Sequence, residues 1–362
     1  LKHQKLIQEC KKKHVFPQLF WEELIAMGIY QNATKYRGID GIVYLAAAIE
    51  GLCYGSLDGG IAISMIAHLG LGFSVLTTHA EENLKKKLLN KIINEGAIIS
   101  FATTEPHGGS DPTKLESTVI RRGNYYILNG EKWCITNAPI ADIIITFARE
   151  VKTNNPVSIV VEKSWAGVKV TDLCPIGLQS SPLGRINFNN VEVPIDNILG
   201  PIGTGLIVMN DGFTRERLLA PFASVGIMAR VLDESFNYAL NRSVFGDKIA
   251  SHQFIKHRLT EMKLSLDTTQ SLGHAALKKF IANDSMLGIA SAAKMYASSQ
   301  AFNVVEHAIK IYGSYGIQEG SIGDILTSVM AACIAGGTEE IHREGIFQDL
   351  YINYRKRSKR SS

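Results

Sequence analysis

Apolar residues recur along the chain at two different spacings, and the change of spacing divides the chain into three segments. Up to about Gly96 the spacing is helical, as in WEELIAMGIY (21–30) and AEENLKKKLLNKIINEG (80–96). The second stretch has acidic residues early and a glycine at its end, which are typical start and stop signals of a helix. The first segment is therefore expected to be all helical.

The middle segment, over about 97–205, has the short apolar runs that are typical of strands. In YYILNGEKWCIT (125–136), the pair Asn129–Gly130 stands between two apolar runs and predicts the turn of a β-hairpin. Asn189–Asn190 in INFNNVEVP (186–194) predicts a second turn of this kind. This segment is expected to be all β.

From about Leu206 onward the spacing is helical again. One apolar stripe there falls at alternating steps of four and three, at Leu218, Phe222, Val225, Ala229, Leu232 and Phe236. Several such stripes are broad and rich in alanine, so these helices are expected to pack closely, within one subunit or across two. The predicted order is all-α, then all-β, then all-α.

These changes of pattern predict four parts. They are an N-terminal helical domain over 1–97, a middle β domain over 98–205, a C-terminal helical bundle over 206–354 and a basic tail over 355–362. The tail supplies five positive charges, so the net charge of +4 becomes −1 without it. Because no basic stripe continues into the body of the chain, nucleic acid is not an expected partner.

The composition is that of an ordinary soluble protein, with 46% hydrophobic and 20% charged residues in a chain of 362. The five cysteines are scattered and form no C-x-x-C motif, which favours a reducing, cytoplasmic compartment over disulfides or a metal site. The most apolar stretch, Ile61 to Leu76, is shorter than the roughly 20 residues that a membrane span needs. A buried helix and no membrane span are expected there.

No G-x-G-x-x-G follows a predicted strand and no Walker loop occurs, so a classical dinucleotide domain is not expected. FATTEPHGGSDP (101–112) instead offers a glycine pair followed by Ser110 and Asp111, whose N–H groups suit a phosphate, although such residues also form ordinary turns. In KWCITN, strand alternation predicts one face with Trp133, Ile135 and Asn137 and the other with Cys134 and Thr136.

Five motifs resemble, in order and spacing, those of the acyl-CoA dehydrogenase family: TTEPHGGSD, NGEKWCITN, NRSVFGDKIASHQ, IYGSYG and GGTEEIHR. Together they cover essentially the whole chain. The resemblance implies an α+β multidomain fold, with an N-terminal all-α domain, a middle β-barrel or sandwich that binds flavin, and a C-terminal four-helix bundle. It further implies bound FAD, a homotetramer or homodimer, and oxidation of an acyl thioester between Cα and Cβ. Electrons would pass to an electron-transfer flavoprotein or to oxygen.

The resemblance also implies which residues would contact FAD. In the middle domain these are Phe101, Thr103, Thr104, Gly109, Ser110, Cys134 and Thr136. From the helical domain, in part from a neighbouring subunit, they are Arg242, Phe245, Gln253, Lys310, Gly313, Thr338 and Glu340. Two positions depart from the family pattern, because Cys134 stands where tryptophan is usual and Lys310 where glutamine is common.

The reaction needs a carboxylate beside the substrate's Cα. Most members of the family carry that glutamate directly before the GT of the C-terminal motif, where this chain has Gly336. Glu216 in GFTRERLLAP resembles the alternative base of isovaleryl, long-chain and prolyl-carrier types, and Arg217 and Gly336 would then adjoin the substrate. Alternatively, Thr214 caps a helix and Glu216 is an acid of its first turn that serves only the helix dipole.

Three functions remain open at this point. The first is FAD-dependent α,β-dehydrogenation of an acyl thioester, on CoA or on an acyl or peptidyl carrier protein, in a specialised pathway of secondary metabolism. The second is oxidation of a hydroxyacyl thioester, or monooxygenation, on the same fold. The third is a non-catalytic binding protein that retains the fold.

Overall fold

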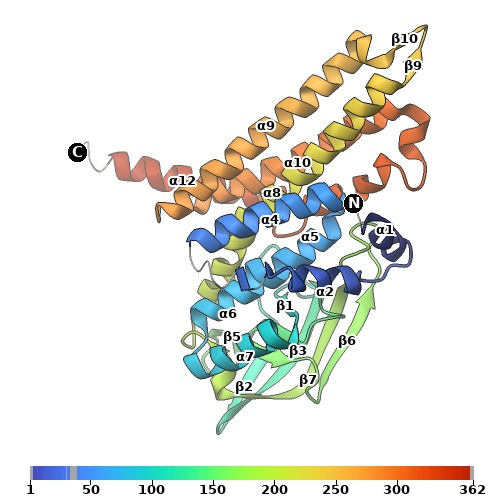
Figure 1. The fold of residues 1–362 in the computed structure, drawn as a ribbon. Helices are drawn as coiled ribbons and strands as arrows, with labels where there is room; N and C mark the ends of the chain where they lie inside the picture. The colour runs from blue at the N-terminus through green and yellow to red at the C-terminus, as the bar shows by residue number, and fades with distance from the viewer. Residues whose placement is uncertain (1–2, 30, 33–38, 359–362) are drawn as a thin grey trace.

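The computed structural model describes residues 3–29, 31–32 and 39–358. Helices from the N-terminal third lie between a β-sheet at one end of the molecule and a set of long helices at the other (Figure 1). This order of helices, sheet and helices confirms the three-part fold that the apolar spacing predicts.

The N-terminal helices are short except for one. They are α1 (Gln4–Lys12), α2 (Gln18–Ala26), α4 (Ile39–Ser56), α5 (Gly59–Met65), the π-helix η1 (Ile66–Phe73), α6 (Ser74–His79) and α7 (Glu82–Glu95). Gly96 ends α7 with a φ of +74°, a left-handed conformation that glycine adopts without a steric penalty.

The predicted buried helix is confirmed in the continuous run α5–η1–α6. It is long and apolar enough to cross a membrane, but 89% of its apolar window is buried inside the molecule, as in the core helix of a soluble protein. Gly72 allows the π-helix to approach the sheet, since a Cβ there would stand 2.3 Å from the side chain of Ile99. The run therefore serves as packing between helices and sheet.

The sheet has eight strands in the order β6-β7-β3-β2-β4-β5-β8, with β1 pairing in parallel with β4. The strands are β1 (Ile99–Ala102), β2 (Thr118–Arg122), β3 (Tyr125–Thr136), β4 (Ile143–Glu150), β5 (Pro156–Glu162), β6 (Val168–Leu173), β7 (Leu183–Pro194) and β8 (Ile198–Leu199). Strand β4 is buried on both faces: Ile143 and Ile145 pack into the helical core, and Ile144 packs into the sheet's own core. This two-sided burial fits the central place of β4 between sheet and helices.

Both predicted hairpin turns are wrong. Strands β3 and β7 run straight through Asn129–Gly130 and Asn189–Asn190, and the β2–β3 turn falls at Gly123 instead. The pairing of β3 with β7 is irregular next to Asn129, whose Oδ1 accepts a hydrogen bond from the Asn190 backbone N–H at 2.8 Å. The asparagine and glycine residues thus serve a β-bulge, a second structure that favours the same residue types.

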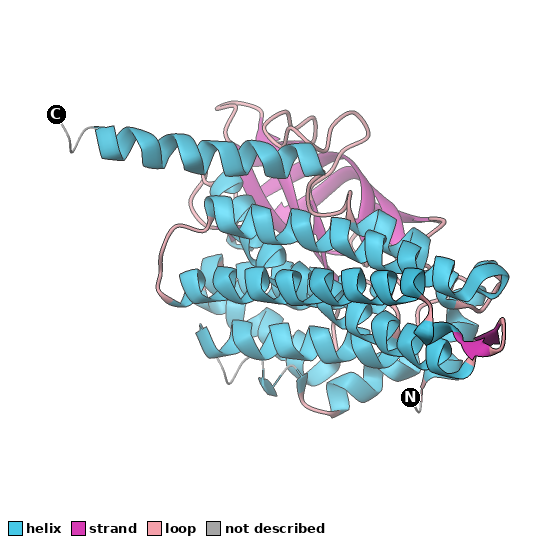
Figure 2. Cartoon of the chain, turned by 90° about the horizontal axis from the view of Figure 1, so that it is seen from above, coloured by secondary structure: helices cyan, strands magenta, loops and turns pink. Residues whose placement is uncertain are grey.

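The C-terminal part consists of long helices that lie side by side, with the sheet beyond them in the view of Figure 2. Its elements are α8 (Gly205–Asn241), β9 (Ser243–Val244), β10 (Asp247–Lys248), η3 (Ile249–Ser251), α9 (Gln253–Ile281), α10 (Leu287–Tyr312), η4 (Gly313–Ile317), η5 (Ile322–Ile325), α11 (Leu326–Ala332) and α12 (Glu339–Ser358). The predicted stripe of α8 is buried at Leu218, Phe222 and Val225 but emerges at Phe236, which is 49% exposed.

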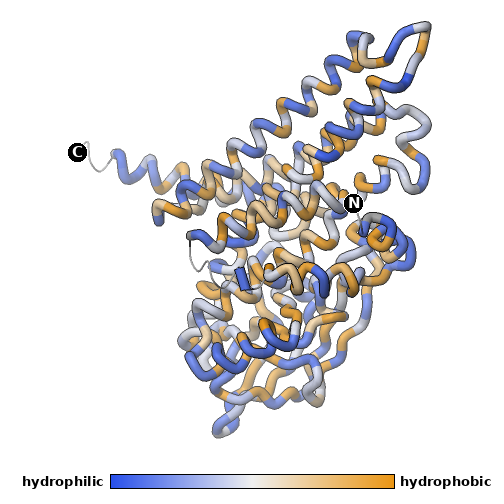
Figure 3. Tube along the Cα trace, viewed as in Figure 1, coloured by the Kyte–Doolittle hydropathy of each residue, from blue (hydrophilic) through white to orange (hydrophobic). Residues whose placement is uncertain are grey.

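The expected basic tail starts inside a helix. Helix α12 continues to Ser358, so Arg355 to Arg357 belong to its last turns, and residues 359–362 lie outside the described residues. This end of α12 is hydrophilic and projects away from the rest of the molecule (Figure 3).

Candidate active site

Glu216 lies well inside a helix and not at its start. Helix α8 begins at Gly205, about three turns before Glu216, and the hydroxyl of Thr214 donates to the carbonyl of Asn210 within that helix at 2.8 Å. The alternative in which Thr214 caps the helix is therefore wrong, because the helix already continues through Asn210. The dipole of a helix N-terminus falls off within the first turn and does not account for an acid at this position.

The carboxylate of Glu216 occupies the room beside Gly336. A Cβ built on Gly336 would stand 2.6 Å from Glu216 Oε1 and 3.0 Å from Oε2. Gly336 also has a φ of +70°, which side chains rarely adopt. The resemblance implies a catalytic base at position 336 in most family members and at position 216 in others. In this chain the two positions are in direct contact, although they are 120 positions apart in the sequence.

Two cations accompany this carboxylate, Arg217 on α8 and Lys294 on α10. Burial raises the pKa of Glu216, and the charges of Lys294 and Arg217 oppose that rise. Glu216 Oε2 is shielded from solvent and has no hydrogen-bond partner among the described residues. A desolvated carboxylate with a free oxygen is a stronger base than one in water.

Arg217 and His342 complete the polar surroundings of Glu216. The Arg217 guanidinium lies 5.8 Å from the centre of the Phe213 ring, and burial lowers its pKa. Burial, followed by the charges of Lys294 and Arg217, lowers the pKa of His342 to about 3. His342 is therefore neutral near pH 7, and the positive charge facing Glu216 comes from Lys294 and Arg217.

Replacing Gly336 with alanine is expected to slow turnover at least tenfold. The new Cβ displaces the Glu216 carboxylate, and the left-handed backbone costs about 1 kcal/mol in addition. Gly123→Ala is the matched control, since Gly123 has a φ of +60° and no atom within 4 Å of the new Cβ. The control should lose similar stability in thermal melting and keep its rate. Equal rates in the two variants would contradict the packing of Glu216 on Gly336.

The sheet side of the site meets α8 next to Glu216. The rings of Phe101 on β1 and Phe213 on α8 have centroids 6.0 Å apart, and a Cβ on Gly212 would reach within 2.9 Å of the Phe101 ring. A small cavity lies between Phe213 and the loop that holds Thr103 and Gly109. Phe101, Thr103 and Gly109 are thus brought within reach of the helix that carries Glu216.

A buried ion pair that the sequence analysis missed holds this loop on the sheet. Lys132 Nζ lies 2.6 Å from Glu105 Oε1, and both side chains are almost fully buried. Glu105 also accepts hydrogen bonds from the backbone N–H groups of Glu116 and Ser117. Both residues stand inside the two motifs quoted above, but their spacing gave no sign that they meet.

The strand faces predicted for KWCITN are wrong at Trp133. A register shift between Lys132 and Ile135 places two residues in the bulge, and Cys134 adopts a φ of +55°. Lys132 and Ile135 are consequently buried, Trp133 is only partly exposed beside Arg185, and Cys134 is exposed. An inserted bulge residue reverses the alternation of every residue before it.

The remaining sequence-predicted residues form two further groups. Thr338 directly precedes α12 and Glu340 lies in its first turn, just after the glycine pair Gly336–Gly337. Arg242, Phe245, Gln253, Lys310 and Gly313 gather at the far ends of α8, α9 and α10, away from the sheet (Figure 1). There the Arg242 guanidinium lies 5.8 Å from the centre of the Tyr315 ring, which follows Gly313 closely.

The residues on the sheet side fit the chemistry of a flavin dinucleotide. Thr103, Thr104 and Thr136 offer hydroxyls, none of them fully buried, at the ends of β1 and β3. The exposed residues Gly109 and Ser110 offer backbone N–H groups, while the N–H of Gly108 already donates to the carbonyl of Glu105 at 3.1 Å. Hydroxyls and open backbone N–H groups are the donors that phosphate and polar ring edges accept.

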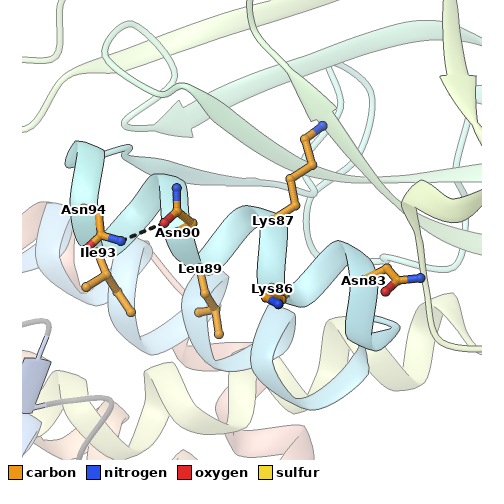
Figure 4. A pocket seen from close by; sticks show the side chains of 7 residues that line it. All are labelled: Asn83, Lys86, Lys87, Leu89, Asn90, Ile93 and Asn94. Atoms are coloured by element: carbon orange, nitrogen blue, oxygen red, sulfur yellow. Dashed lines mark hydrogen bonds between the residues drawn. The ribbon is translucent and has the colours of Figure 1, made fainter.

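A groove on the surface of α7 lacks the hydroxyls described above. It has a volume of about 590 Å³, and all its lining residues come from one exposed helix face between Asn83 and Asn94 (Figure 4). Its side chains are asparagines, lysines and aliphatics, with Asn94 bonded to Asn90 at 2.7 Å. No acid or aromatic group lines this groove, so the region around Glu216 remains the candidate site.

Family models match nearly the whole chain in three consecutive pieces. They are the acyl-CoA dehydrogenase N-terminal domain over 2–96, the middle domain over 100–191 and the C-terminal domain over 203–351. The chain is 32% identical to 3-(aryl)acrylate reductase of Clostridium sporogenes, over 95% of this chain and 93% of the relative. It is 29% identical to L-prolyl-[peptidyl-carrier protein] dehydrogenase of Serratia sp., over 91% and 88%. The chain belongs to the acyl-CoA dehydrogenase family.

Solved structures agree with this assignment. The crystal structure of the prolyl acyl carrier protein oxidase AnaB is similar with a TM-score of 0.89 and 30% identity, covering 96% of this chain and 98% of AnaB. The FAD complex of PigA is similar with a TM-score of 0.89 and 28% identity, covering 96% and 93%. The protein is accordingly a flavin-dependent oxidoreductase with FAD as its cofactor.

Proposed function

We propose that the protein removes two hydrogens from Cα and Cβ of an acyl thioester, and that Glu216 is the base. The observation that carries the proposal is the contact between Glu216 and Gly336. The carboxylate reaches from α8 into the place that a side chain at position 336 would otherwise take. The usual base is absent from this chain, and Glu216 supplies a carboxylate at the same point in space.

The chemistry follows from the surroundings of Glu216. The carboxylate takes the proton from Cα, and the electron pair left behind forms the Cα=Cβ double bond as a hydride leaves Cβ. Bound FAD supplies the hydride acceptor. Burial, which raises the pKa of Glu216, makes the carboxylate a better proton acceptor. Arg217 and Lys294 keep it ionised, which a base requires before each turnover.

We further propose that two copies of the chain share each FAD site. Arg242, Phe245 and Gln253 stand at the opposite end of the long helices from Thr103 and Ser110, so one chain cannot bring both groups to one cofactor (Figure 1). Phe245 is 95% exposed, and Phe254 beside Gln253 is 82% exposed. Aromatic rings this open in an isolated chain favour burial against a second copy, in a dimer or tetramer.

Replacing Arg242 with alanine is expected to weaken FAD retention at least tenfold and to leave flavin reduction at saturating FAD nearly unchanged. Arginine presents a fixed fork of donors that suits a phosphate or an adenosine edge, and alanine presents none. FAD release is followed by its fluorescence, and subunit assembly by sedimentation. Unchanged FAD affinity in an oligomeric variant would contradict the shared site. Arg121→Ala, at the exposed end of strand β2, serves as the control.

The acyl carrier is CoA or a carrier protein, and relatives with each kind of substrate are similar to this chain. We propose a specialised pathway, because this chain has Cys134 where the resemblance implies a tryptophan beside the flavin. Electron-transfer flavoprotein or oxygen then takes the electrons. We place the protein in the cytoplasm, a reducing compartment, because all five of its cysteines are free.

The proposal is tested by mixing the purified yellow protein anaerobically with a panel of acyl-CoA and acyl-carrier thioesters. Bleaching of the flavin absorbance identifies the substrate, and mass spectrometry of the product gives the reaction. Loss of two hydrogens with a new C=C bond supports the proposal. A new carbonyl at a hydroxylated carbon, or gain of an oxygen atom, would replace it with hydroxyacyl oxidation or monooxygenation. A protein that binds no FAD would point to a non-catalytic role.

A further inference from the structure

Lys294 lies in the interior of the molecule, and none of the described carboxylates forms an ion pair with it. It stands on α10 and is only 3% exposed. In the described part of the chain its one hydrogen-bond acceptor is the backbone carbonyl of Gly337, at 2.9 Å from Nζ. A buried ammonium is costly unless its charge and protons are used, so its position calls for a role.

The segment that Lys294 contacts has no side chains of its own to hold it. Gly336 and Gly337 both have positive φ, +70° and +114°, and they form the turn between α11 and α12. This turn is the wall against which the Glu216 carboxylate lies. A shift of the turn by a few tenths of an ångström would change the room for Glu216, and the hydrogen bond from Lys294 opposes such a shift.

We propose that Lys294 is a positioning residue for the base: it fixes the glycine turn (residues 336–337) against Glu216 and keeps the carboxylate ionised. The inference rests on the proposed role of Glu216. Lys294 acts on the base through the turn, by its hydrogen bond to the Gly337 carbonyl, and through its charge.

The charges around the pair agree with this role. Two positive charges lower the pKa of Glu216 and so oppose the effect of burial. The charge of Lys294 has the larger effect and that of Arg217 the smaller. Burial lowers the pKa of Lys294 to about 8, while Glu216, Cys333 and Glu339 raise it and Arg217 lowers it further. His342 on α12 is neutral at these pH values. Below about pH 8 Lys294 therefore carries its proton and favours the ionised form of Glu216.

The sign of the pH effect follows. The rate of proton abstraction falls as the pH falls through the pKa of Glu216, because only the ionised carboxylate accepts a proton. Removing the charge of Lys294 raises that pKa, so the pH below which the rate falls moves upward. The expected shift is roughly one pH unit, the lower end of the range for a neighbouring opposite charge. The apparent pKa belongs to the coupled pair, so the comparison is between variants.

The experiment compares the FAD-loaded proteins Lys294→Met, Lys294→Arg and Lys263→Met. Lys263 is 59% exposed on α9, pairs with Asp267 and serves as the control. Flavin reduction is measured against pH by stopped flow, and the protonation of Glu216 by the carboxyl band in infrared difference spectra, assigned with Glu216→Gln. Hydrogen exchange of segment 333–338 reports the turn.

In Lys294→Met, both the pH below which the rate falls and the pH at which the infrared carboxyl band titrates should be higher than in the wild type. Amide exchange in the turn should also be faster. Lys294→Arg, which keeps the charge, should restore both pH values toward those of the wild type. Unmoved pH values in Lys294→Met, with only a lower melting temperature, would reduce Lys294 to a packing residue. If Glu216→Gln itself keeps the wild-type rate, the proposed function fails; if it loses the rate while Lys294→Met keeps the wild-type pH profile, only this inference fails.

Discussion

Replacing Glu216 with glutamine is expected to slow anaerobic flavin reduction by a factor on the order of 10²–10⁴, the usual contribution of a general base. The amide is nearly isosteric with the carboxylate, so it fills the same room beside Gly336. It cannot accept the Cα proton, and it removes a charge that burial disfavours. FAD content should therefore stay near that of the wild type while the rate is lost.

Glu261→Gln is the matched control for this variant. Glu261 is on α9, and its side chain is 44% exposed and 4.0 Å from His257. Its replacement should leave flavin reduction unchanged. A Glu216→Gln protein that reduces its flavin at nearly the wild-type rate would exclude Glu216 as the base. Substrate affinity, measured from the flavin spectral shift on binding, separates lost chemistry from lost binding.

The largest expected effect on stability comes from Lys132→Met. This change leaves the Glu105 carboxylate buried without its ammonium partner, and breaking a buried pair from one side costs about 3–5 kcal/mol. Glu105 carries the loop that follows β1, so the loop should loosen and FAD affinity should fall with it. Denaturant unfolding of the variant and wild type at equal FAD concentration measures the difference.

The neighbouring exposed pair supplies the control. Glu131 on the same strand binds Arg185 at 2.6 Å, with side chains 24% and 44% exposed. Because solvent screens such a pair, Glu131→Gln should cost no more than about 1 kcal/mol. If Lys132→Met also lowers the free energy of unfolding by no more than that amount, the buried pair contributes nothing to the stability of the loop.

Much of the fold could be predicted because periodicity reports which face of an element is buried. The change from helical to strand spacing near Ala97 and back near Leu206 matches the observed elements closely. The hairpins could not be predicted, because Asn129–Gly130 favours a turn and a bulge alike. The choice depends on Asn190 across the sheet, which is a tertiary contact.

The candidate site was predictable only in part. The ERL stretch pointed to Glu216, but the helix that contains it begins too early for the local reading of Thr214 as a cap. Lys294 stands in an alanine- and serine-rich helix, where a lysine is usually on the surface; the glycine turn before α12 covers it. The Glu105–Lys132 pair likewise joins two motifs whose distance in space no spacing rule encodes.

The central claim, that Glu216 removes the Cα proton, is tested most directly by hydrogen exchange at Cα in the absence of oxidation. An acyl thioester with oxygen or sulfur at the β position has no Cβ hydride to lose, so a proton removed from Cα has to be returned to it. In D₂O the protonated base exchanges with solvent between removal and return, and this exchange places deuterium at Cα. With holoenzyme in D₂O, we expect NMR to show deuterium entering Cα with the wild type. With Glu216→Gln, exchange should be no faster than in buffer. Exchange at the wild-type rate in Glu216→Gln would contradict the account.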